Sequence, residues 1–117
     1  MSLIVYGIKN CDTMKKTFAF LEAKGSGYVF FDYKKQAPDA DFLRGVIAKS
    51  SLAAVVNTQG TTYKKMGDAE KVALAEEESA LPILMANPSM IKRPIIVYPD
   101  GSITLGFLPE LIASKLP

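Results

Sequence analysis

The first 33 residues constrain the fold more than any other part of this 117-residue chain. An apolar run at residues 3–6 predicts a short buried strand. Residues 12–24 predict an amphipathic helix, for which Asp12 and Thr13 are both competent N-caps. The aromatic and β-branched run at residues 28–33 predicts a second strand. A strand, a helix and a strand over so short a stretch form a βαβ unit, in which the two strands are parallel.

The remainder of the chain predicts a helical segment followed by a hairpin and a last helix. The helical stretches expected in the middle are residues 42–47, 52–56, 68–77 and 80–87, with a polar loop at residues 57–62. Pro82 fits only the first turn of its helix. The expected hairpin strands are residues 95–98 and 103–105, joined by a Pro-Asp-Gly turn, and residues 109–116 predict the closing helix. We therefore expect one α/β domain over residues 1–117, with a helical insertion at about residues 38–90.

Composition excludes several classes of function. The chain has one cysteine and no histidine, which removes Ser-His-Asp and Cys-His catalysis and the common zinc sites, so no metal is expected. Its net charge of +2 and the lack of a long basic run argue against a nucleic-acid partner. No apolar run approaches the roughly 20 residues of a membrane span, and no signal peptide begins the chain. A single cysteine fits a reducing compartment, so we expect a cytoplasmic protein.

Cys11 is the main candidate for chemistry. It lies between the first predicted strand and the first predicted helix, where backbone N–H groups and the helix dipole stabilise an anion. A thiol at such a position has a lowered pKa, and the nearby Lys9 adds positive potential. The alternative is a buried, inert cysteine. The polar neighbours Asn10, Asp12 and Thr13 favour the reactive interpretation.

The residues after Cys11 exclude two other kinds of cysteine site. The fourth residue of the Cys-Asp-Thr-Met sequence is Met14, so the chain has no dithiol pair. The phosphatase pattern places an arginine six residues after the cysteine, where this chain has Thr17. Any adduct formed on Cys11 therefore has to be resolved by a thiol from another molecule.

Arg93 and Pro94 form a second candidate site. The order β-α-β, helical insertion, β-β-α is that of a thioredoxin-like fold, which places a cis-proline at the start of its third strand, beside the active-site thiol. Pro94 is in that position, and Arg93 would then direct a guanidinium toward Cys11, to hold the thiolate or an anionic group of a substrate. The alternative is an ordinary surface arginine before a turn proline.

A third candidate is the polar stretch at residues 57–65, which includes this loop and contains Asn57, Gln59 and Lys64. Its hydrogen-bonding side chains could line the other side of a cleft. The alternative, which the residues by themselves favour, is a connector between two helices.

Four motifs together resemble the arsenate reductase-like (ArsC/Spx/YffB) family. They are residues 6–13 (Tyr-Gly-Ile-Lys-Asn-Cys-Asp-Thr), 57–65 (Asn-Thr-Gln-Gly-Thr-Thr-Tyr-Lys-Lys), 91–94 (Ile-Lys-Arg-Pro) and 105–107 (Leu-Gly-Phe). They occur in the family's order and spacing over nearly the whole chain. The resemblance implies a thioredoxin-like fold with a helical insertion, Cys11 as nucleophile and Arg93 as its anion-binding partner.

The YffB branch is the closest resemblance, and its members are proposed to be glutathione-dependent thiol reductases. The resemblance implies a thiol oxidoreductase with no bound cofactor, glutathione as co-substrate, and glutathione or a glutaredoxin-type dithiol protein as partner. The expected substrate- and glutathione-binding residues are Lys9, Asn10, Asp12, Thr13, Asn57, Gln59, Lys64 and Pro94.

Two alternatives stay open within the family. Glutaredoxin-coupled arsenate reductases use three arginines around the cysteine, and only Arg93 matches, with Asn57 and Gly106 aligned to the other two. A non-catalytic Spx-like regulator would bind RNA polymerase instead. Spx proteins usually carry a two-cysteine switch, which Met14 interrupts here.

Overall fold

The computed structural model describes residues 2–117, whose contacts divide the chain into two compact units. One unit extends up to Gln36 and resumes at Arg93, and the other is the continuous segment from Ala37 to Lys92. No helix within residues 2–117 has the length and apolar character needed to cross a membrane.

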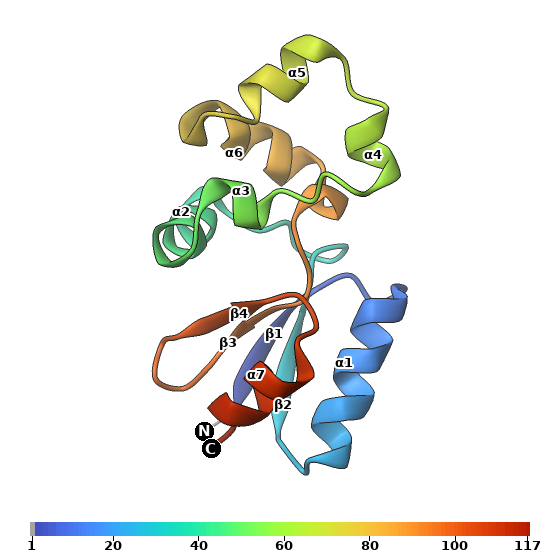
Figure 1. Cartoon of the computed structure of the whole chain (residues 1–117), viewed down its shortest axis with the longest axis vertical. Helices are drawn as coiled ribbons and strands as arrows, with labels where there is room; N and C mark the ends of the chain where they lie inside the picture. The colour runs from blue at the N-terminus through green and yellow to red at the C-terminus, as the bar shows by residue number, and fades with distance from the viewer. Residues whose placement is uncertain (1) are drawn as a thin grey trace. The chain divides into compact units, whose positions relative to one another are not determined.

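The first unit contains a four-stranded sheet in the order β2-β1-β3-β4 (Figure 1). Its strands are β1 (Leu3–Gly7), β2 (Tyr28–Asp32), β3 (Ile95–Val97) and β4 (Ile103–Leu105), and its helices are α1 (Asp12–Ala23) and α7 (Pro109–Lys115). β1 pairs with β2 in parallel, while the β1–β3 and β3–β4 pairs are antiparallel. The predicted β-α-β … β-β-α order of a thioredoxin-like fold is thus confirmed, including the hairpin and the closing helix.

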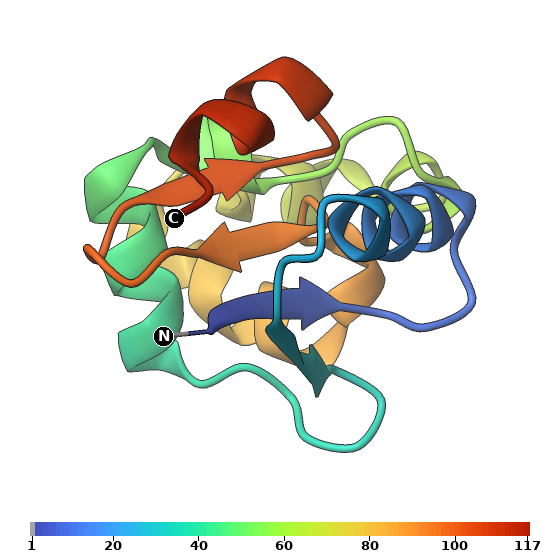
Figure 2. The same cartoon turned by 90° about the horizontal axis from the view of Figure 1, so that it is seen from below.

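Both helices of this unit pack on the same face of the sheet (Figure 2). Leu3 and Val5 point to that face because alternate strand residues share a side. Leu21 of α1 and Ile112 of α7 join them in one cluster, all fully buried. The cluster fixes α1 against β1, and therefore fixes the loop that joins these two elements.

The second unit is helical, as the sequence predicts. It contains α2 (Ala40–Lys49), α3 (Leu52–Val55), α4 (Thr61–Lys64), α5 (Asp68–Ala73), α6 (Glu77–Ala86) and the short 3₁₀ helix η1 (Pro88–Met90). Arg44 on α2 donates two hydrogen bonds to the Glu78 carboxylate on α6, at 2.9 and 3.2 Å. Both side chains are exposed, so this pair contributes little to stability.

Two details of the helical segment differ from the prediction. The loop expected at residues 57–62 ends earlier, because α4 begins at Thr61. Pro82 lies inside α6 rather than in its first turn, since that helix already begins at Glu77. Proline has no N–H, so the Glu78 carbonyl one turn earlier receives no hydrogen bond from residue 82. Both Glu78 and Pro82 are exposed. Water can hydrogen-bond to that carbonyl, which makes the interior proline tolerable.

Asp39 caps α2, and this gives a first prediction about stability. Its carboxylate accepts a hydrogen bond from the Phe42 amide at 2.7 Å. We expect Asp39→Ala to lower the free energy of unfolding by about 1 kcal/mol, the usual effect of losing such a cap. Asp41→Ala is the control, since it removes a charge from the same helix turn but no cap. Equal unfolding curves for the two variants in urea would show that the cap contributes nothing.

Candidate active site

Cys11 is the N-cap residue of α1. Its backbone is extended, its N–H donates to the Lys9 carbonyl at 3.1 Å, and its carbonyl accepts from the Lys15 amide at 3.0 Å. The prediction that Asp12 or Thr13 would cap this helix is wrong, because those residues already form its first turn. The sequence favoured Asp12 and Thr13 because their side-chain oxygens are the usual N-cap acceptors, whereas the residue found at the cap, Cys11, carries a sulfur. The thiol is therefore placed at the positive end of the helix dipole.

The surroundings of Cys11 favour its thiolate. Partial burial by itself raises the pKa of the thiol, since a less polar environment disfavours the charged form. This effect is outweighed by interactions with the Met14 amide, the Arg93 side chain and the Thr13 amide, so the pKa lies below its ordinary value. The two amides make no conventional cap hydrogen bond to the neutral side chain. They act on the charged sulfur, which is the reactive form.

Arg93 reaches Cys11 from the start of β3. Its side chain hydrogen-bonds to the sulfur, and its positive charge further lowers the thiol pKa. The Arg93–Pro94 peptide bond is cis, as predicted. The Pro94 carbonyl accepts a hydrogen bond from the Gly106 amide at 2.8 Å, which ties this turn to the end of β4. The structure thus brings together the two residues, Cys11 and Arg93, that the sequence singles out as catalytic.

Gly7, at the end of β1, leaves room for the side chain of Met14. A Cβ atom at this position would lie 2.6 Å from the Met14 Sδ and Cε atoms and 3.6 Å from the Arg93 Cβ. The sequence used Met14 only to exclude a dithiol pair, and did not predict that its amide would act on Cys11. The contact of the Met14 amide with Cys11 could have been predicted once Cys11 was taken as the N-cap, because the third helical residue presents its amide to the capping side chain.

The predicted binding residues next to Cys11 lie in the same unit. Lys9, Asn10 and Asp12 are exposed, and Thr13 is half-buried. All four lie within two residues of Cys11 in the sequence. Their role in substrate or glutathione binding stays a prediction.

Asn57, Gln59 and Lys64 belong to the other unit, from Ala37 to Lys92. The Asn57 side-chain oxygen accepts from the Gln59 amide at 3.1 Å, which closes a turn of the Asx type. The Asn57 amide donates to the Met90 carbonyl at 2.6 Å. Asn57 therefore has a structural role in its own loop, while Gln59 and Lys64 are exposed. A contribution of these three residues to substrate binding stays a prediction.

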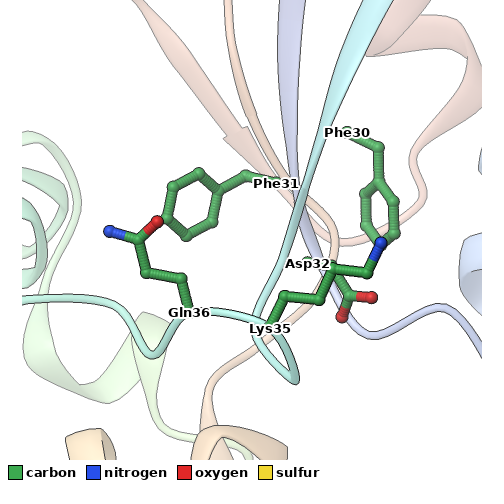
Figure 3. A pocket seen from close by; sticks show the side chains of 5 residues that line it. All are labelled: Phe30, Phe31, Asp32, Lys35 and Gln36. Carbon is green, nitrogen blue, oxygen red and sulfur yellow. The ribbon is translucent and has the colours of Figure 1, made fainter.

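A small pocket of about 170 Å³ lies at the end of β2, and none of the predicted site residues lines it (Figure 3). Its lining residues are Phe30, Phe31, Asp32, Lys35 and Gln36, and the two phenylalanines point to opposite sides of the strand. The volume is below the roughly 300 Å³ of ordinary ligand pockets. Within residues 2–117, histidine, cysteine, aspartate and glutamate side chains form no group of three that could hold a metal ion.

The lowered thiol pKa predicts a pH-dependent contribution to stability. In the unfolded chain Cys11 keeps its proton up to about its ordinary pKa of 9.0, whereas the folded protein releases it at lower pH. The thiolate therefore stabilises the folded protein fully at pH values above the thiol pKa of the unfolded chain. This stabilisation is lost as the pH falls through the lower thiol pKa of the folded protein. We expect the stability of the reduced wild type relative to Cys11→Ser, from urea unfolding, to increase as the pH rises toward the ordinary thiol pKa of 9.0. A difference that decreases over this range would contradict the lowered pKa.

The chain is similar to several known proteins over most of its length. The chain matches the ArsC family over residues 6–114. The solved structure of a YffB protein is 39% identical, with a TM-score of 0.92 over 99% of this chain and 100% of that one. An uncharacterized protein of Haemophilus influenzae is 36% identical over 105 residues, which is 90% of each chain. The arsenate reductase of Rhizobium meliloti is 24% identical, over 94% of this chain and 84% of that protein. The predicted resemblance is confirmed, and the chain belongs to the ArsC family.

Proposed function

We propose that this protein is a thiol oxidoreductase that uses Cys11 as its single nucleophile and glutathione as co-substrate. The observation that carries the proposal is the position of Cys11 at the N-terminus of α1, hydrogen-bonded by Arg93. Both features stabilise the thiolate, and the thiolate is the form that attacks a disulfide. Membership of the ArsC family supports the same class of chemistry.

The reaction follows from ordinary thiol–disulfide exchange. The Cys11 thiolate attacks one sulfur of a disulfide, the bond between the two substrate sulfurs breaks, and the other half leaves as a thiolate. The protein is then a mixed disulfide. Because the chain has no second cysteine, a thiol from glutathione or from a dithiol protein attacks this mixed disulfide and releases Cys11. Arg93 favours the thiolate at the start and again when Cys11 leaves.

Incubation with oxidised glutathione tests the proposal. We expect one glutathione adduct per chain by intact-mass analysis, located on Cys11 by peptide mapping and removed by reduced glutathione. Cys11→Ser is the control and should form none, since the chain has one cysteine. If the native wild type forms no adduct while the urea-unfolded chain does, Cys11 is not an accessible nucleophile and the proposal is wrong.

Arsenate reduction is a second candidate, because relatives such as the Rhizobium meliloti protein are arsenate reductases. In that reaction the Cys11 thiolate would attack the arsenic atom of an arsenate held by Arg93. A sulfur–arsenic bond would form while one arsenic–oxygen bond breaks, and that oxygen would leave as water after protonation. The family resemblance supplies only this one arginine of the three expected around the cysteine.

A further inference from the structure

Tyr33 is the first residue after β2, and its side chain is 3% exposed. Its amide donates to the Gly7 carbonyl at 2.9 Å, which attaches it to the end of β1. The phenolic oxygen is buried, and no group within residues 2–117 forms a hydrogen bond with it. A buried hydroxyl in this condition has lost its bonds to water and gained none in return.

Tyr98 provides a direct comparison in the same unit. It is also 3% exposed, but its hydroxyl forms a hydrogen bond of 2.8 Å with the Thr104 hydroxyl. Buried polar groups are nearly always satisfied in this way. At position 33 a phenylalanine would fill the same space without the unsatisfied oxygen. The hydroxyl of Tyr33 therefore destabilises the reduced folded protein, and its presence needs an explanation other than stability.

The electrostatic surroundings of Tyr33 connect it to the active site. Burial raises the pKa of its phenol strongly, the neighbouring Tyr6 raises it further, and the charge of Arg93 acts in the opposite direction. The phenol is thus neutral at physiological pH and lies within electrostatic reach of the guanidinium. A guanidinium only donates hydrogen bonds, and a neutral phenol oxygen can accept them.

Oxidation of Cys11 changes what Arg93 can bind. In the reduced protein the guanidinium hydrogen-bonds to the Cys11 sulfur. When the thiolate attacks a disulfide, a sulfur–sulfur bond forms, a thiolate leaves, and the negative charge of Cys11 disappears. Arg93 then loses a charged acceptor, while its own charge stays in place.

We propose that Tyr33 is a positioning residue whose hydroxyl accepts a hydrogen bond from Arg93 when Cys11 is in a mixed disulfide. The buried oxygen of Tyr33 serves as the acceptor in the oxidised state, which gives the hydroxyl a role at a position where phenylalanine would suit the reduced fold. The inference rests on the proposed function only in that Cys11 must form a mixed disulfide.

The test compares wild type with Tyr33→Phe in two redox couples, using intact-mass analysis to measure the equilibrium constant for adduct formation. Hydroxyethyl disulfide yields an uncharged adduct that offers Arg93 no carboxylate. Here the constant should fall about tenfold in the variant, as expected for one hydrogen bond to a charged group. Glutathione disulfide should show a smaller decrease, since its carboxylates also accept from Arg93. The melting temperature of reduced Tyr33→Phe should equal or exceed that of the wild type.

Tyr98→Phe is the matched control, because it removes a buried hydroxyl that is already satisfied. It should lower the melting temperature of the reduced and oxidised forms alike and leave both equilibrium constants unchanged. Equal constants for wild type and Tyr33→Phe with hydroxyethyl disulfide would overturn the inference. If hydroxyethyl disulfide reacts but glutathione disulfide does not, the proposed function fails while the inference is still tested. No adduct with either reagent would contradict both.

Discussion

Arsenate is expected to be reduced at least about a hundredfold less efficiently by this protein than by an arsenate reductase with three arginines at its cysteine. Each hydrogen bond to a charged group contributes about 1.5–3 kcal/mol. Two missing arginines therefore remove about 3–6 kcal/mol, or roughly two to four orders of magnitude in kcat/KM. The measurement is a coupled assay with reduced glutathione and glutaredoxin, with the three-arginine enzyme as positive control.

Gly106 gives a structural reason why one of those arginines is absent. Its φ of +85° is a conformation that residues with side chains rarely adopt, although a Cβ there would meet nothing within 4 Å. The backbone at this position, rather than a lack of space, disfavours an arginine. Saturable arsenate reduction close to that of the control enzyme would contradict the prediction. Lysines such as Lys9 or Lys64 would then have to replace the missing guanidiniums.

Replacing Arg93 with alanine should have the second large effect. The variant loses the hydrogen bond and the charge that stabilise the Cys11 thiolate, so the pKa of the thiol should rise. Alkylation by iodoacetamide near neutral pH should slow by roughly three- to tenfold, since solvent at this half-exposed site weakens the interaction. Arg93→Lys should recover part of the rate, because lysine keeps the charge but loses the planar fork.

The control for this experiment is Arg44→Ala, which removes the other arginine of the chain. Arg44 pairs with Glu78 on exposed surface in the other unit, so its loss should leave the alkylation profile unchanged. If Arg93→Ala also leaves the profile unchanged, Arg93 does not act on the resting thiolate. A similar decrease in both variants would point to net charge rather than to contact with Cys11.

The parts of the fold that were predictable are those in which local pattern and packing agree. The strand at residues 3–6 was recognisable because Leu3 and Val5 belong to the buried core. The strand at residues 28–33 was recognisable from its aromatic and β-branched residues, although its own residues from Tyr28 to Asp32 are at most partly buried. The Pro-Asp-Gly turn marked the hairpin, and Pro109 occupies the first turn of α7, as expected. The helical unit was less predictable in detail. The four residues of α4 include none that is buried, so hydrophobic periodicity could not reveal this helix.

Only part of the candidate site was predictable from local sequence pattern. Cys11 was identified from its place between a strand and a helix, although the exact cap residue was not. The contact between Cys11 and Arg93 joins residues far apart in the chain, and the family resemblance rather than local pattern supplied it. Tyr33 could not have been found this way. Its sequence context resembles an ordinary strand end, and the burial of one oxygen atom depends on packing from several elements.

The central claim is that Cys11 acts as a stabilised thiolate, and the pH dependence of its alkylation tests this most directly. The rate of iodoacetamide modification, followed by intact mass on the reduced native protein, should titrate with an apparent pKa below the ordinary value of 9.0. The same protein unfolded in urea should titrate at the ordinary value. An apparent pKa in the native protein equal to or above that of the unfolded chain would contradict the account.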